Sequence, residues 1–249
     1  MKTLFFSATG NNMYIAKRLG GEAVSIPQLV KNNDYYVADD KIGLVFPIYF
    51  LSVPKHIAAF LAKVELECGY LFAVMSCGNY PGAAVNQLAN ILTKRGYDLA
   101  YATTITMVDN WLPMFDIDKQ LKGEPKKKID ARLDAIVRDV ESGKQCVKRA
   151  SVVARAATRL LAGQYPGDGM CKSYTVDAHC NGCGICVHVC PMDNITIADD
   201  QPLFGDTGIS CLACTHNCPQ NAIRAKGEKS KTRFRNQHVA LAEIVKANK

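Results

Sequence analysis

Seven cysteines near the C-terminal end of the chain have the spacing of iron–sulfur ligands. They fall in two runs that each end in Cys-Pro: Cys180, Cys183, Cys186 and Cys190 in the first run, and Cys211, Cys214 and Cys218 in the second. Thiolates at such intervals can surround a cubane of iron and sulfide, and the last cysteine of a run can ligate the neighbouring cluster. Zinc is a weak alternative, because structural zinc usually takes pairs of cysteines separated by a longer spacer.

The two runs belong to an internal repeat with an offset of 28 positions. Cys183 aligns with Cys211, Cys190 aligns with Cys218, and each Cys-Pro pair precedes a hydrophobic strand. Residues 171–226 therefore resemble the bacterial two-cluster ferredoxin. The resemblance implies a small α+β domain whose strands enclose the clusters in an apolar shell that excludes water.

One ligand of the repeat is missing, because Cys180 aligns with Gly208. Crossed ligation, as in two-cluster ferredoxins, gives one 4Fe-4S cluster four ligands and the second cluster only three. The first set is Cys180, Cys183, Cys186 and Cys218, and the second set is Cys190, Cys211 and Cys214. The second cluster is then 3Fe-4S, 4Fe-4S with a non-cysteine cap, or 4Fe-4S with an open iron. Asp206 is the nearest oxygen candidate for a cap and Cys171 the nearest spare thiol, and Gly208→Cys is expected to restore an ordinary second cluster.

A hydroxyl- and glycine-rich loop follows the strand predicted at residues 2–7. The loop consists of Ser7, Ala8, Thr9, Gly10, Asn11 and Asn12. It leads into a helical pattern that ends at Gly20-Gly21. Backbone N–H groups, hydroxyls and the positive end of a helix dipole converge in such a loop, which is typical of a phosphate site. A capped turn without a ligand is the structural alternative.

Two later loops could hold a flat ring system. They follow buried strands predicted at residues 42–46 and 70–76. One loop contains Pro47, Ile48, Tyr49 and Phe50, and the other contains Ser76, Cys77, Gly78, Asn79, Tyr80 and Gly82. Aromatic side chains offer ring faces, and flexible backbone can hydrogen-bond to ring edges. No Gly-x-Gly-x-x-Gly fingerprint with a downstream acid is present, so a dinucleotide site is not supported.

Strands alternate with helices through the first half of the chain. This order predicts an α/β fold with a doubly wound parallel sheet, whose ligand lies beyond the carboxyl ends of the strands. Residues 1 to about 140 resemble flavodoxin. The resemblance implies a five-stranded sheet, an FMN phosphate in the loop of residues 7–12, and the flavin ring between the two later loops. Cys77 would then lie close to the flavin, whereas Trp111 is interpreted as a core or rim aromatic.

Four segments follow from these patterns. They are a flavodoxin-like FMN-binding domain (residues 1–143), a helical linker (144–170), a two-cluster ferredoxin-like domain (171–226) and a basic C-terminal tail or helix (227–249). We place the boundary in the proline and glycine cluster of residues 163–169. Taken together, the chain resembles the fused flavodoxin and ferredoxin family of anaerobic microbes over nearly its full length.

The composition argues for a cytoplasmic protein without a membrane span. Hydrophobic residues make up 48% of the 249 residues, yet no apolar stretch approaches the roughly 18 residues of a transmembrane helix. The apolar run at the N-terminus is too short for a signal peptide. Eleven cysteines therefore favour metal ligands over disulfides. Cys68, Cys77, Cys146 and Cys171 lie outside the runs, and we interpret them as small hydrophobes. His179 and His216 are interpreted as outer donors or surface histidines.

The net charge of +7 is unevenly distributed. Between residues 119 and 159, twelve Lys or Arg accompany five Asp or Glu. Solvated helix faces explain most of this charge, since apolar residues recur there at helical spacing. If the charge binds a partner, an acidic redox protein is preferred over nucleic acid, because no aromatic stacking platform accompanies it.

These features predict an electron-transfer protein. FMN exchanges one or two electrons and each cluster exchanges one. The chain is therefore expected to pass electrons between FMN, two clusters and a redox protein such as a ferredoxin or an oxidoreductase. The alternative is an enzyme, a flavin-dependent reductase of a small organic acceptor fed through the clusters. No His, Lys or Tyr stands out as its proton donor, so no catalytic residue is assigned.

Overall fold

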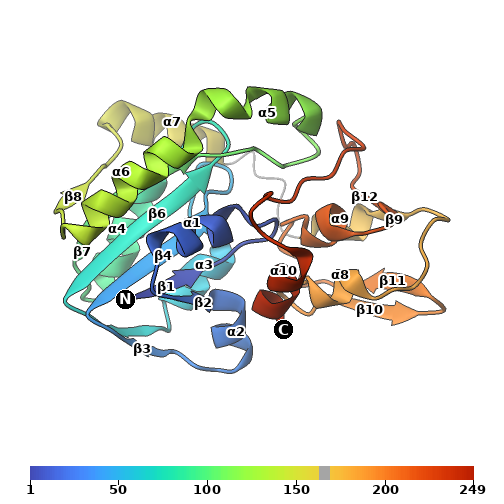
Figure 1. The fold of residues 1–249 in the computed structure, drawn as a ribbon, viewed down its shortest axis with the longest axis horizontal. Helices are drawn as coiled ribbons and strands as arrows, with labels where there is room; N and C mark the ends of the chain where they lie inside the picture. Colours follow the sequence, from blue (N-terminus) through green and yellow to red (C-terminus); the bar gives the residue numbers. More distant parts are fainter. Residues whose placement is uncertain (163–168) are drawn as a thin grey trace. The chain divides into compact units, whose positions relative to one another are not determined.

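The computed structural model describes residues 1–162 and 169–249, which group into two compact units (Figure 1). The first unit consists of Met1–Ser7, Asn12–Met107 and Glu124–Tyr165, and the second of Ala8–Asn11, Val108–Gly123 and Pro166–Lys249. The boundary expected at residues 163–169 lies almost entirely outside the described residues.

A parallel sheet forms the centre of the first unit. Its strand order is β2-β1-β4-β6-β7-β8. The strands are β1 (Lys2–Phe5), β2 (Glu22–Ser25), β4 (Lys41–Pro47), β6 (Tyr70–Cys77), β7 (Leu99–Thr106) and β8 (Cys146–Val147). The first five have the 2-1-3-4-5 order of flavodoxin-like folds, which confirms the predicted fold class. The two-residue strand β8, from the segment expected to be a linker, adds a sixth strand at the edge. A separate small sheet pairs β3 (Tyr36–Ala38) with β5 (Glu65–Glu67).

Helices cover both faces of this sheet. They are α1 (Asn11–Leu19), α2 (Ile26–Lys31), α3 (Lys55–Leu61), α4 (Ala84–Lys94), α6 (Ile129–Glu141) and α7 (Val152–Ala162), with the 3-10 helix η1 (Glu124–Lys127) before α6. Figure 1 shows α1 and α6 in front of the sheet and α3 and α4 behind it. The central strand β6 is buried along its whole length, as expected for a parallel strand covered on both faces. No helix in the described part of the chain is long and apolar enough to cross a membrane.

Gly43 marks a close approach of side chain to backbone in the sheet. It pairs with Phe72 of β6, and a Cβ at Gly43 would overlap the fully buried Phe72 ring. Gly43→Ala is therefore expected to lower the free energy of unfolding by about 1–3 kcal/mol, the usual effect of overpacking, in a denaturant titration. Phe72→Leu in the same chain should recover part of this loss. An unchanged stability of Gly43→Ala would contradict the contact.

The second unit is built from short elements. They are α5 (Ile117–Gly123), the 3-10 helix η2 (Met170–Ser173), β9 (Thr175–Val176), α8 (Ile185–His188), β10 (Ile195–Ala198), β11 (Gln201–Phe204), α9 (Ala213–Asn217), β12 (Ile223–Arg224) and α10 (Leu241–Asn248). Strand β10 pairs antiparallel with β11, and β9 pairs antiparallel with β12. Small antiparallel sheets with short helices agree with the expected ferredoxin-like α+β domain.

The sequence repeat is also present in the backbone. Gly184, before α8, has a φ of 73°, and its equivalent Leu212, before α9, has a φ of 60°. Asp193 and Asn221, which follow the two Cys-Pro pairs, have φ values of 49° and 50°. A left-handed backbone costs a non-glycine residue about 1–2 kcal/mol. Leu212 adopts the left-handed conformation despite this cost. This indicates that both cysteine runs require the same backbone conformation at this position.

Two segments outside the cysteine runs complete the core of the second unit. One buried cluster joins residues 108–117 to the residue before α9, the residue after β12 and the tail: Val108, Leu112, Ile117, Leu212, Ala225 and Phe234. Trp111 packs against this cluster, in agreement with its interpretation as a core or rim aromatic. The tail also buries Asn236 and Val239. The C-terminal segment is thus an integral part of the second unit as well as a carrier of positive charge.

Candidate functional site

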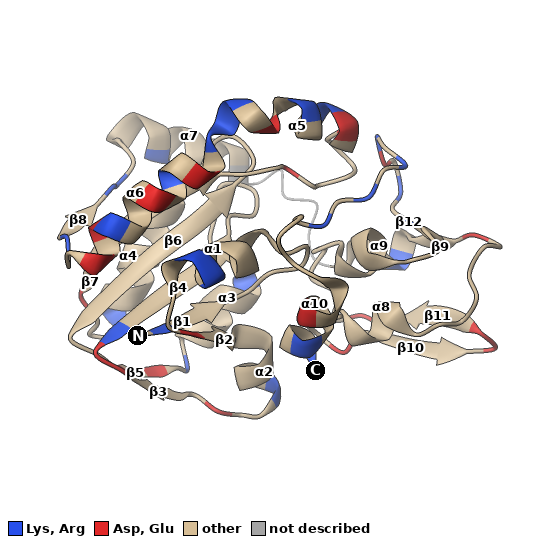
Figure 2. Ribbon diagram, in the orientation of Figure 1, with Lys and Arg blue, Asp and Glu red and all other residues tan. Residues whose placement is uncertain are grey.

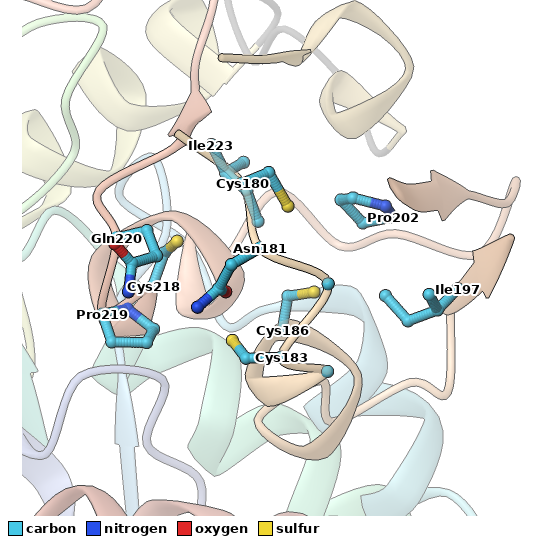
Figure 3. Close-up of a pocket in the computed structure, with 12 residues that line it drawn as sticks. Cys180, Asn181, Cys183, Cys186, Ile197, Pro202, Cys218, Pro219, Gln220 and Ile223 are labelled. Carbon is cyan, nitrogen blue, oxygen red and sulfur yellow. The ribbon is translucent and has the colours of Figure 1, made fainter. Parts of the chain in front are cut away.

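Four cysteines from the two runs line one pocket of the second unit (Figure 3). Cys180, Cys183 and Cys186 come from the first run, and Cys218 comes from the second. The space among the lining residues is about 310 Å³, including its opening to solvent. These are the four thiols that crossed ligation assigns to one cluster.

The remaining cysteines of the runs are Cys190, Cys211 and Cys214, and two of them, Cys190 and Cys214, are buried in one cluster with Cys186. Burial raises the pKa of the Cys211 thiol to about 12, and interactions with Cys190 and Cys171 add to this effect. Burial likewise raises the pKa of Cys214 well above its usual value, with further contributions from Cys211 and Cys190. Cys190 lies close to Cys171, because both sulfur atoms accept a hydrogen bond from Asn194. The described side chains do not converge on a point that would hold a single metal ion.

Backbone N–H groups donate to sulfur at equivalent places in the two runs. Asn194 N–H donates to Cys190 Sγ over 3.4 Å, and Ala222 N–H donates to Cys218 Sγ over 3.3 Å. Each donor lies four residues after its cysteine. Hydrogen bonds to sulfur stabilise the thiolate form and help to set the reduction potential of a cluster.

An apolar shell surrounds the thiols. Ile195 and Ile223 are buried together with Cys186, Cys190 and Cys214. Tyr174 and Phe204 close the shell, with ring centroids 5.7 Å apart and planes at 80°. Burial raises the pKa of Cys186 to about 11. A coordinating metal reverses this preference, because a coordinating thiol is deprotonated outright. The shell therefore fits a buried, water-excluding metal centre.

The nearest oxygen candidate for the second cluster, Asp206, forms an ion pair with a lysine instead. The side chain of Asp206 is 82% exposed, and its Oδ1 lies 2.7 Å from Lys172 Nζ. His179 is exposed as well. The thiol of Cys171, in contrast, is buried beside Cys190.

His216 is a buried structural residue, although we expected an outer donor or a surface histidine. The residue is only 4% exposed. Its Nδ1 accepts from Phe234 N–H over 3.1 Å, so Nε2 carries the proton and donates to Asn110 O over 2.7 Å. Burial lowers the pKa of His216 to about 4, so the ring is neutral. It joins α9 to two distant segments of the second unit.

The loop after β1 is buried and held by its carbonyl oxygens. Within the second unit, Asn217 Nδ2 donates to Ala8 O over 3.0 Å, and Asn236 N–H donates to Thr9 O over 2.9 Å. The hydroxyl of Thr9 accepts from Asn110 Nδ2 over 2.6 Å. None of these bonds uses a backbone N–H of the loop, which is the group that would face an anion.

Asn12 tests whether this loop fits a phosphate. It lies in the first turn of α1, where the helix dipole is positive. Its Oδ1 is buried without a hydrogen-bond partner in the described structure. The two ends of an asparagine amide can be exchanged, and the amide N–H₂ would donate to a phosphate oxygen. The residues present therefore fit an anion at the helix N-terminus.

The loop of residues 47–50, the first of the two loops expected to hold the flat ring, is a strained turn. Tyr49 and Ser52 exchange backbone hydrogen bonds of 3.0 Å, while Phe50 and Leu51 have φ values of 45° and 65°. Bulky residues rarely adopt a positive φ, and such strain is typical of functional loops. Ile48 N–H donates to Ser76 O over 2.8 Å, which ties this loop to the second one. The turn holds two bulky side chains at its tip.

The loop of residues 76–82, the second of these two loops, packs against the first. A Cβ on Gly82 would lie 2.5 Å from Leu51 Cβ. Cys77 is buried at the start of the loop, and Tyr80 is exposed. Lys127 of η1 holds the middle of the loop, because its Nζ donates to Gly78 O over 3.1 Å and also to Met107 O. Nothing in the sequence distinguishes Lys127 from the basic residues around it, so this anchor could not be predicted.

Comparisons with known proteins agree with the cysteine geometry. Residues 179–223 match the sequence model of the 4Fe-4S dicluster domain. No curated protein matches the chain. Two solved structures each align with 43% of the chain: a candidate flavoprotein from Bacteroides uniformis (15% identity, 88% of its chain, TM-score 0.32) and the Trp repressor binding protein from Bacillus subtilis (8% identity, 83% of its chain, TM-score 0.30).

The two units together define the organisation of the chain. Both TM-scores are below 0.5, so the fold of the first unit is assigned from its own strand order. The second unit contains the matched dicluster segment, and the general role of such clusters is redox electron transfer. The chain is a fusion of a flavodoxin-like domain with a ferredoxin-like domain of the 4Fe-4S dicluster type.

Proposed function

We propose that the chain transfers electrons between FMN, two iron–sulfur clusters and a redox partner protein such as a ferredoxin or an oxidoreductase. The observation that carries the proposal is the position of Cys218, which lines the same pocket as Cys180, Cys183 and Cys186. In this proposal these four thiolates hold one 4Fe-4S cluster. Cys190, Cys211 and Cys214 contribute three ligands to the second.

FMN is assigned to the carboxyl edge of the parallel sheet. Strands β1, β4 and β6 are neighbours and parallel, so the loops that follow them leave from the same edge. The loop of residues 7–12 would bind the phosphate, and the loops of residues 47–50 and 76–82 would hold the ring. Bound FMN supplies one- and two-electron chemistry, whereas a cluster passes single electrons. The protein contributes orientation, exclusion of water and hydrogen bonds to sulfur.

The partner is expected to present an acidic surface. Basic residues predominate along residues 226–235, as Figure 2 shows. Part of this charge is used internally, since Arg233 forms an ion pair with Glu228 at 2.9 Å. Lys229 and Lys231 remain for long-range attraction of an acidic protein, which acts mainly on the association rate. No disulfide joins any of the eleven cysteines, all of which lie in the described part of the chain, and this suits a reducing cytoplasm.

Anaerobic purification tests the proposal directly. The full chain should contain FMN, iron and acid-labile sulfide, and a reduced ferredoxin should bleach the flavin without any organic substrate. A chain without iron would contradict the cluster assignment, and a chain without FMN would contradict the flavin assignment. If the flavin were reduced only when an organic substrate was present, the chain would instead be a substrate-specific reductase.

Lys127 offers a test of the second ring loop. Lys127→Met removes the ammonium that binds Gly78 O and Met107 O, so the loop should become less ordered. We expect FMN to bind about tenfold more weakly, which is about 1.4 kcal/mol, in a fluorescence titration of the flavin-free protein. The neighbouring Lys126→Met is the matched control and should bind FMN normally. Equal affinities of the two variants would exclude this anchoring role.

A further inference from the structure

Gly208 is the position at which the repeat lacks a cysteine, and another cysteine fills the space beside it. A Cβ built on Gly208 would overlap the sulfur of Cys171 and would lie 3.4 Å from Cys171 Cβ. The side chain of Cys171 thus comes from outside the repeat and reaches the place where a cysteine at position 208 would begin. Glycine at position 208 is what leaves room for it.

The neighbours of Cys171 are the thiols of the incomplete set. Cys171 is only 6% exposed. Its sulfur accepts a hydrogen bond from the side chain of Asn194, and the backbone N–H of the same residue donates to the sulfur of Cys190. The thiol therefore lies close to Cys190, a ligand already assigned to the second cluster, and at the place where a cysteine at position 208 would begin.

Two further contacts hold the sulfur of Cys171 in this position: it donates to Gly205 O over 3.7 Å and accepts from Asn194 Nδ2 over 3.4 Å. The backbone N–H of Asn194 donates to Cys190 Sγ, also over 3.4 Å. Asn194 Oδ1 accepts from Thr207 N–H and Oγ1, over 2.7 and 2.8 Å. One buried asparagine therefore orients two sulfur atoms of the set and fixes the chain next to Gly208. Hydrogen bonds to ligand atoms of this kind are typical of metal sites.

We infer that Cys171 is the fourth protein ligand of the second cluster, which makes that cluster a complete 4Fe-4S centre. This assignment rests on the proposed function and specifies it. On binding, the thiol proton is released to solvent and an Fe–S bond takes its place, with no change in oxidation state. Neither the 3Fe-4S form nor an oxygen cap is then required. The sequence-based expectation for Gly208→Cys also changes, because a second thiol would compete with Cys171 for one space.

Cys171→Ala is the first test, on the full chain purified without oxygen. The wild-type chain should contain about eight irons in two 4Fe-4S clusters. The variant should lose between about one and four of these irons, and the oxidised protein should show the EPR signal of a 3Fe-4S cluster or only one remaining cluster. Cys68→Ala, in the first unit, is the matched control and should keep the wild-type iron content. A Cys171→Ala variant with wild-type iron and EPR spectra would overturn the inference.

The double variant Cys171→Ala/Gly208→Cys separates ligation from misfolding. It removes the thiol at position 171 and places a thiol at position 208 instead. The overlap between a side chain at position 208 and the Cys171 sulfur is then absent. Iron content and the spectrum of two 4Fe-4S clusters should return, whereas a double variant as deficient as the single one would contradict the inference. A wild-type chain with no iron would instead refute the proposed function itself.

Discussion

Replacement of Cys218 by alanine is expected to destroy the cluster held by the first cysteine run, although Cys218 belongs to the second. Cys218 lines one pocket with Cys180, Cys183 and Cys186, so its removal leaves that cluster with three thiolates. We expect a loss of between about one and four of some eight irons, measured together with EPR of the reduced protein. The second cluster should remain.

Double variants identify which cluster each cysteine serves. If Cys183 and Cys218 bind the same cluster, Cys183→Ala/Cys218→Ala should leave the other cluster intact, because both substitutions affect one and the same cluster. Cys183→Ala/Cys190→Ala should damage both clusters. If the two double variants gave the reverse result, each run would hold its own cluster and crossed ligation would be wrong.

The sheet and the cysteine runs could be predicted because their signals are local. A parallel strand buried on both faces is a continuous apolar run, as in β4 and β6. Cluster ligands of a two-cluster domain have fixed short spacings. Strand β8, by comparison, has two residues and carries no such pattern, so the sequence could not distinguish it from a linker. Its pairing with β7 depends on the sheet already being formed.

The features that were missed depend on contacts between distant segments. Asn217 and Ala8 are 209 positions apart, and Asn236 and Asn11 are 225 positions apart, yet hydrogen bonds join each pair. Asparagines of this kind look like ordinary polar residues in a sequence. The sequence marks Cys171 only as a spare thiol, since its closeness to Gly208 depends on how the chain folds back. Spacing can reveal that a ligand is missing, but not which residue replaces it.

Gly10→Ala is expected to weaken FMN binding by about tenfold to a hundredfold, or about 1.4–2.8 kcal/mol. Gly10 has a φ of 97°, which costs an alanine about 1–2 kcal/mol. An added Cβ would also lie 3.0 Å from the Cβ atoms of Asn236 and Val239. Because the tail holds Thr9 O, the loop cannot move away without losing that bond. A displaced loop would no longer direct its N–H groups at the phosphate.

Gly20→Ala, at the other end of α1, is the matched control. Gly20 has a φ of 79°, but a Cβ there meets nothing within 4 Å. It should reduce stability by about 1–2 kcal/mol through the same backbone strain and leave FMN affinity unchanged. Gly10→Ala/Val239→Gly should recover part of the affinity, because it removes the contacts of Val239 Cβ and Cγ1 but not the backbone strain. If Gly10→Ala bound FMN as tightly as Gly20→Ala, residues 7–12 would be a capped strand-to-helix turn, and FMN would need a different phosphate site.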